Sequence, residues 1–244
     1  NYRALLQAAG YDPDGLYATV TEAGGAVLCA SCHASEALPG SGIDGVSPLT
    51  QAVHRSMAHA TDPQTGLRLD DIDNRSACYS CHPGAETRCL RGAMGAAVAA
   101  DGTAAMQCQS CHGSMLEVGS PARTGWLEEP ACQDCHSGNA TGNEGEIRYD
   151  SVFTADGSRR IPANDLFATN PDTPAPGISL YRFSRGHGGL QCSACHGSTH
   201  AIFPSSHDND NVQSIALQGH AGTLVECIAC HDEVPETGNG GPHG

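Results

Sequence analysis

The pattern Cys-x-x-Cys-His occurs six times in this chain of 244 residues and takes up twelve of its thirteen cysteines. Cysteines three residues apart lie on one side of a helical turn, so both sulfur atoms can reach the same flat ring. The histidine that follows then lies beneath that ring. This spacing is the attachment signature of haem c, in which two thioether bonds hold the porphyrin and the histidine binds the iron. The six copies are Cys29, Cys32 and His33; Cys78, Cys81 and His82; Cys108, Cys111 and His112; Cys132, Cys135 and His136; Cys192, Cys195 and His196; and Cys227, Cys230 and His231.

Other uses of Cys-x-x-Cys explain the sequence less well. Zinc sites, thioredoxin-like redox pairs and disulfide frameworks do not require a histidine after every second cysteine. Attachment of haem needs reduced cysteines and a dedicated machinery outside the cytoplasmic membrane. The motif therefore predicts an extracellular or cell-surface protein, with a periplasmic location as the alternative. The first residue, Asn1 rather than Met, agrees with an exported and processed chain.

The composition leaves little material for an ordinary hydrophobic core. Aromatic residues make up 5% of the chain, and the mean hydropathy is -0.30. Each haem is served by roughly 40 residues, which is too little chain for large sheets. We therefore expect a mostly irregular and α-helical fold with little β-structure, in which short helices and long loops surround a core of haems. We predict a single domain over residues 1–244, with a haem-free insertion at about 137–190.

The net charge of -15 arises from 27 acidic and 12 basic residues, and none of the basic residues is lysine. A surface this acidic repels phosphate backbones, so nucleic acid is not expected as a partner. The chain contains no run of eighteen apolar residues, so no membrane span is expected.

Each haem iron has a second axial position, and the group that fills it separates electron transfer from catalysis. Seven histidines remain for six irons once the motif histidines are set aside. Methionine could serve instead at Met57, Met94, Met106 or Met115. We predict ligation by two histidines throughout, and His243 is left over, free to bind a haem of a neighbouring subunit. The expected distal ligands are His54, His59, His187, His200, His207 and His220.

The positions of these histidines predict long-range ligation. Between His82 and His187 the only histidines are those of two haem motifs. Some distal ligands of the central haems must therefore come from distant segments or from another molecule. His54 and His59 fall in a predicted helix over 47–59, with Ser47 as its N-cap and Pro48 in its first position. Five residues rotate about 140° on a helix, so we expect these two side chains to serve different haems.

Further helices are expected over Tyr2–Ala9, Asn211–Leu217 and Ala221–Cys230. Within the insertion, residues 146–161 resemble a β-hairpin with an Asp-Gly turn, and residues 169–177 an extended linker. Acidic clusters around 70–74 and 208–211 could bind calcium through oxygen ligands, although a polar loop explains either of them as well. The thirteenth cysteine, Cys89, is interpreted as a buried thiol, with an intermolecular disulfide as the alternative.

The phrases CYSCHPGAETRCLRGAM, CQSCHGSM, EPACQDCHSG and GLQCSACHGSTH resemble segments of the exported multihaem c-type cytochromes of metal-reducing bacteria. The motifs span the chain from Cys29 to His231, so the resemblance covers most of it. It implies haems ligated by two histidines, arranged in a series of stacked and T-shaped pairs. Some hexahaem proteins of this class polymerise, with a histidine of one subunit binding a haem of the next.

These features predict electron transfer along six closely spaced haems, without substrate turnover. Redox proteins or extracellular acceptors are the expected partners, together with copies of the same chain if it forms a filament. Two alternatives stay open. One is a multihaem reductase with one open haem site, and the other is a soluble periplasmic electron shuttle.

Overall fold

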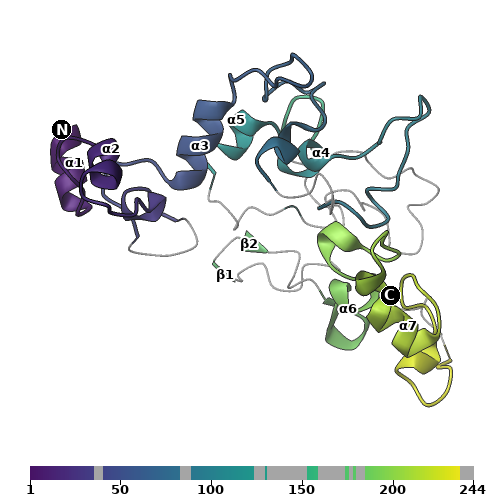
Figure 1. The fold of residues 1–244 in the computed structure, drawn as a ribbon. Helices are drawn as coiled ribbons and strands as arrows, with labels where there is room; N and C mark the ends of the chain where they lie inside the picture. Colours follow the sequence, from purple (N-terminus) through teal and green to yellow (C-terminus); the bar gives the residue numbers. More distant parts are fainter. Residues whose placement is uncertain are drawn as a thin grey trace. The chain divides into compact units, whose positions relative to one another are not determined.

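A computed structural model describes residues 1–35, 41–82, 89–123, 130, 153–158, 174–175, 178–179 and 185–236. Short helices and irregular segments make up nearly all of this part of the chain, and strands are almost absent, as expected (Figure 1). The chain forms two compact units. The first contains Asn1–Asp71 and Ser114–Glu128, and the second contains Ile72–Gly113 and Glu129–Gly244.

The first unit begins with two short helices, α1 (Tyr2–Ala8) and α2 (Leu16–Thr21). The Asn1 side chain accepts a hydrogen bond from the Arg3 amide and caps α1, which confirms the helix predicted there apart from its last residue. The Thr19 hydroxyl accepts from the Asp12 amide at 3.0 Å, so the loop between the helices is fixed to α2. A single 3₁₀ turn, η1 (Cys29–Ser31), follows.

Helices α3 (Leu49–Met57) and α5 (Met115–Val118) pack against each other in the same unit (Figure 1). Gly119 permits the contact, because a Cβ atom there would lie only 2.9 Å from the Arg55 backbone nitrogen. The helix predicted over 47–59 is shorter at both ends. Pro48 is its N-cap, and His59 lies beyond its end, where the chain turns and the Asp70 amide donates to the Ala58 carbonyl.

The second unit is a series of short elements joined by loops. Its strands form two antiparallel pairs, β1 with β2 and β3 with β4. Its described elements are η2 (Ala77–Ser80), α4 (Cys108–His112), β1 (Pro174–Ala175), β2 (Ile178–Ser179), β3 (Arg185–Gly186), η7 (His187–Gly189), β4 (Leu190–Gln191), α6 (Cys192–His196), η8 (Thr199–Ala201), η9 (Asp208–Asn211), α7 (Val212–Gln218) and η10 (Cys227–Ala229).

Two helices were predicted near the end of this unit, and only the first forms. The helix expected over 211–217 is present as α7. The helix expected over 221–230 is wrong, because only η10 is helical there. The side-chain amide of Gln218 explains the difference. Its nitrogen lies 3.1–3.3 Å from the carbonyl oxygens of His220, Gly222 and Thr223, and its oxygen accepts from the Val225 amide at 3.1 Å. These bonds use backbone groups that a helix would need.

The Asp-Gly turn predicted in the insertion is present. Gly157 has a φ of 82°, and the Thr154 amide donates to the Ser158 carbonyl at 2.8 Å. The arms of the expected hairpin lie outside the described residues. Most of the expected linker over 169–177 also lies outside the described residues. Its described part is β1, which pairs with β2.

Few apolar side chains are buried in either unit. Among the described residues, the buried apolar ones are Leu6, Ala18, Ala58, Leu69, Ala77, Ala201 and Phe203. No helix in the described part of the chain is long and apolar enough to cross a membrane. The residues that the structure describes therefore supply little apolar core of their own.

Candidate haem-binding sites

Five of the six motifs lie in the described residues, and each begins a single helical turn. The histidine amide donates to the carbonyl of the first cysteine at 2.9 Å in His33, His82 and His231. The other two motifs form the short helices α4 and α6. In these five motifs the two cysteines are three residues apart in a helical turn, which brings both side chains toward one side of it.

The cysteines of these five motifs are accessible, as thioether attachment requires. Three of them are exposed, namely Cys29, Cys81 and Cys230. The others are half-buried, and they are Cys32, Cys78, Cys108, Cys111, Cys192, Cys195 and Cys227. The fourth motif lies outside the described residues, so the structure does not place Cys132, Cys135 or His136. His243 lies outside them as well.

Two histidines of the first unit are oriented by backbone carbonyls. His33 Nδ1 lies 2.7 Å from the Ser47 carbonyl oxygen, and His54 Nδ1 lies 2.7 Å from that of Thr50. A carbonyl only accepts, so each Nδ1 carries the proton and donates it. The lone pair is then on Nε2, the atom that binds a metal. Such bonds fix the tautomer and the ring plane of a metal ligand.

The Tyr11 hydroxyl anchors the first motif, and sequence reasoning missed it. It accepts from the Leu28 amide at 2.8 Å and lies 2.9 Å from the Ser31 hydroxyl. These two residues flank Cys29. Nothing in the local pattern points to this contact, because 17 positions separate Tyr11 from Leu28.

His187 lies opposite the sixth motif histidine. The Nε2 atoms of His187 and His231 are 3.5 Å apart, and the rings are T-shaped, with 5.7 Å between their centroids. Bonds from imidazole nitrogen to a first-row metal are about 2.0–2.1 Å long, as for zinc, so two axial nitrogens would lie roughly 4 Å apart. The two Nε2 atoms therefore need to separate by only about 0.5 Å to flank one iron.

His200 lies near the third motif histidine. The ring centroids of His112 and His200 are 6.2 Å apart and the rings are tilted by 52°. A centroid lies about 1 Å behind its nitrogen, so two rings on one metal would be roughly 6 Å apart. In each pair a histidine from a distant segment lies near a motif histidine, and 88 residues separate His112 from His200.

Exposed apolar side chains lie beside the first and the sixth motifs, as a porphyrin site would require. Leu28 and Ile228, next to and within their motifs, are each 64% exposed, and Val225 is 66% exposed. Burying a side chain of this size is worth about 1.5–3 kcal/mol, so a flat apolar group would be stabilised against them. The paired cysteines, the facing imidazoles and these side chains together fit a haem.

The second and third motifs are neighbours. The Cys78 thiol donates to the Cys108 sulfur, and this bond lowers the pKa of Cys108 to about 6 while it raises the pKa of Cys78. The buried Gln109 side chain, inside the third motif, donates to the Asn74 carbonyl at 3.0 Å.

The fifth and sixth motifs are also neighbours. The Leu224 amide donates to the Cys195 carbonyl at 2.9 Å. Burial raises the pKa of the Cys195 thiol, and the nearby Cys230 and Cys192 thiols raise it further.

The remaining predicted ligands differ in their surroundings. His59 is exposed beyond the end of α3. His220 Nδ1 lies 3.0 Å from the Ala221 carbonyl oxygen, and its Nε2 lies 3.8 Å from a Glu226 carboxylate oxygen. His207 Nδ1 accepts from the Asn209 amide and caps η9. The thirteenth cysteine, Cys89, is half-buried.

Residues of the acidic clusters around 70–74 and 208–211 form hydrogen bonds and ion pairs within the protein. The Asp70 carboxylate accepts from the Leu116 amide at 2.8 Å, in the first turn of α5. Asp210 forms an ion pair with Arg91. No group of three or more histidine, cysteine or acidic side chains converges on a metal position within the residues that the structure describes. The groups that do converge are pairs of imidazoles.

Comparison with known proteins adds no further assignment. No protein-family model matches the chain, and neither a curated protein nor a solved structure matches it. The case for haem therefore depends on the residues themselves, namely the repeated motif turns and the imidazoles that face them.

Proposed function

We propose that this protein is a multihaem c-type cytochrome that carries electrons along six covalently bound haems. The observation that carries the proposal is the approach of two distant histidines to motif histidines, with His187 Nε2 3.5 Å from His231 Nε2 and the His200 ring 6.2 Å from the His112 ring. The motif turn accounts for thioether attachment and one axial ligand. The facing imidazole accounts for the second.

The protein residues attach and orient the haems and fill their axial positions. Haem iron, when bound, supplies the one-electron chemistry by alternating between its ferric and ferrous forms. Ligation by two imidazoles gives generally lower reduction potentials than ligation by methionine. The Nδ1 bonds at His33 and His54 keep Nε2 directed away from the backbone, as an iron ligand requires.

Filled axial positions favour electron transfer over catalysis. A substrate needs an open coordination position, and an iron held between two imidazoles has none. Lysine cannot act as an axial ligand here, because the chain contains no lysine. The neighbouring motifs support a chain of closely spaced sites, with the second near the third and the fifth near the sixth.

The proposed setting is outside the cytoplasmic membrane, at the cell surface or beyond it. The net charge of -15 suits cationic or metal-bearing acceptors. We further propose that the chain could assemble with copies of itself, with a histidine such as His243 binding a haem of the next subunit. Electron microscopy of the purified protein tests this, since uniform filaments support it and single particles contradict it.

The test of the main proposal is to express the chain in a host that attaches haem c and to count haems by absorbance after protein quantification. The expected result is six haems per chain. Electron paramagnetic resonance should then show only low-spin ferric haem, and the reduced protein should not bind carbon monoxide. A native protein with a high-spin haem that binds carbon monoxide would instead be a reductase with an open site. Absence of covalent haem would overturn the proposal as a whole.

A further inference from the structure

The backbone around His200 is held by a segment more than one hundred residues earlier. The amides of Arg91 and Gly92 both donate to the His200 carbonyl, at 2.9 and 3.3 Å, and the Ala93 amide donates to the Ile202 carbonyl at 2.9 Å. The Ser206 amide returns a bond to the Arg91 carbonyl at 2.9 Å. His200 thus lies on a short ladder between residues 91–93 and residues 200–206.

The approach of these two segments is closer than any side chain would allow. A Cβ atom on Gly92 would lie 2.3 Å from the Ile202 backbone nitrogen. Ala201 and Phe203, on either side of Ile202, are 1% and 6% exposed. The Phe203 amide also donates to the His196 carbonyl at 2.8 Å. The backbone of His200 is therefore fixed between buried neighbours, while its ring is exposed and faces His112.

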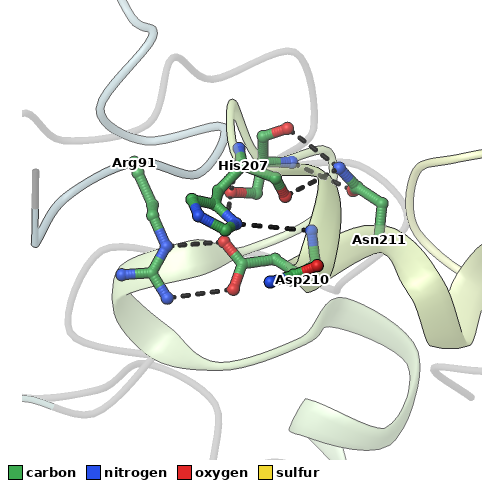
Figure 2. Close-up of polar contacts among 6 residues, drawn as sticks. Arg91, His207, Asp210 and Asn211 are labelled. Atoms are coloured by element: carbon green, nitrogen blue, oxygen red, sulfur yellow. Dashed lines mark hydrogen bonds and ion pairs between the residues drawn. The ribbon is translucent and has the colours of Figure 1, made fainter. Parts of the chain in front are cut away.

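A two-bonded ion pair closes this ladder at one end. Arg91 Nε lies 2.5 Å from Asp210 Oδ2, and Arg91 Nη2 lies 2.9 Å from Oδ1, as the paired dashed lines of Figure 2 show. The Ser205 hydroxyl also donates to this carboxylate at 2.5 Å. The Arg91 and Asp210 side chains are only 30% and 17% exposed. A partly buried, bidentate pair is stronger and more directional than an exposed one.

His207 belongs to the same cluster. Its Nδ1 accepts from the Asn209 amide at 3.3 Å, and its carbonyl lies 3.4 Å from the Asn211 side-chain nitrogen (Figure 2). An imidazole that accepts at Nδ1 carries its proton on Nε2. That proton occupies the lone-pair position at which iron would bind. His33 and His54 show the opposite arrangement.

We propose that the Arg91–Asp210 ion pair is a positioning device that holds His200 opposite His112, and that His207 is a structural cap and not an iron ligand. This inference rests on the proposed function. It also makes the number of available distal histidines equal to the number of irons, because six histidines outside the motifs remain when His207 is set aside. These are His54, His59, His187, His200, His220 and His243.

The test uses the haem-loaded protein and carbon monoxide, which binds an iron only after its distal ligand has left. Arg91→Gln and Asp210→Asn should each raise the apparent carbon monoxide affinity of one haem per chain roughly tenfold, since that affinity scales with the five-coordinate fraction. Arg91→Lys should fall between Arg91→Gln and the wild type, because an ammonium cannot bridge both carboxylate oxygens. Arg3→Gln is the matched control. It breaks a largely exposed Arg–Asp pair with Asp14 in the other unit and should change nothing.

His200→Ala should give one haem per chain that binds carbon monoxide, and adding Arg91→Gln should not raise that number above one. If the double variant exposes more haems, Arg91 acts by general destabilisation and the positioning role is wrong. The role is also wrong if Arg91→Gln and Asp210→Asn both behave like the wild type. His207→Ala should leave all six haems low-spin, and a newly open haem would show that His207 is a ligand. A wild type without six low-spin haems would instead contradict the proposed function.

Discussion

Replacing His187 by alanine should open one iron and leave the other five unchanged. His187 faces His231 with 3.5 Å between their Nε2 atoms, so we expect it to fill the second axial position of the sixth haem. The side chain is exposed, and it is followed by Gly188 and Gly189, so the substitution removes no core packing. About one sixth of the haem in each chain should become high-spin and bind carbon monoxide, a stoichiometry of one per chain.

The assay is carbon monoxide titration of the reduced protein, with electron paramagnetic resonance of the oxidised form. Added imidazole should restore the low-spin spectrum, because it can occupy the space left by the lost ring. The His207→Ala variant is the control, since the same kind of side chain is removed from a site that faces no motif histidine. If His187→Ala retains six low-spin haems and does not bind carbon monoxide, the facing of these two rings does not represent axial ligation.

Three further outcomes follow from individual contacts. Tyr11→Phe should lower the free energy of unfolding by about 1 kcal/mol in a denaturant titration, because the Leu28 amide loses its acceptor, and should leave the haem count unchanged. Gln218→Leu should cost about 1–3 kcal/mol in the same assay, because it frees the loop before the sixth motif. The ion pair with Arg91 lowers the pKa of Asp210 to about 2 from an ordinary value of 3.8. Its stabilisation is therefore present above pH 4 and is lost as the pH falls toward 2. After allowance for solvent screening, the wild type should lose about 1 kcal/mol more than Asp210→Asn over that interval.

The local geometry of the haem motifs could be predicted from the sequence because it depends on neighbouring residues. The spacing of Cys227, Cys230 and His231 requires one helical turn, and η10 supplies it. The N-terminal helix followed in the same way from its own residues. The predicted ends of the helices were less accurate. The helix expected through His59 stops at Met57, because backbone hydrogen bonds to Ala58 and Ala60 turn the chain there.

Contacts made by side chains outside a predicted element could not be predicted from such local patterns. A helix was expected before Cys230 from propensity, but the single side chain of Gln218 binds that backbone in another conformation. The choice among spare histidines has the same origin. Both His207 and His200 were predicted as iron ligands, and only the structure shows that His207 Nδ1 accepts from the Asn209 amide while the His200 ring lies near His112.

The ligand arithmetic links these local findings to the function of the whole chain. If each of the two histidine pairs, His187 with His231 and His200 with His112, holds an iron, two of the six irons are accounted for. If His207 is a cap, the four other irons, on His33, His82, His136 and His196, have four histidines left, namely His54, His59, His220 and His243. A protein in which every haem resists carbon monoxide must then use all four, apart from any replaced by methionine. His243 would be one of them. If it binds a haem of its own chain, the electron path is confined to one molecule, and if it binds a haem of the next chain, the path continues along a filament.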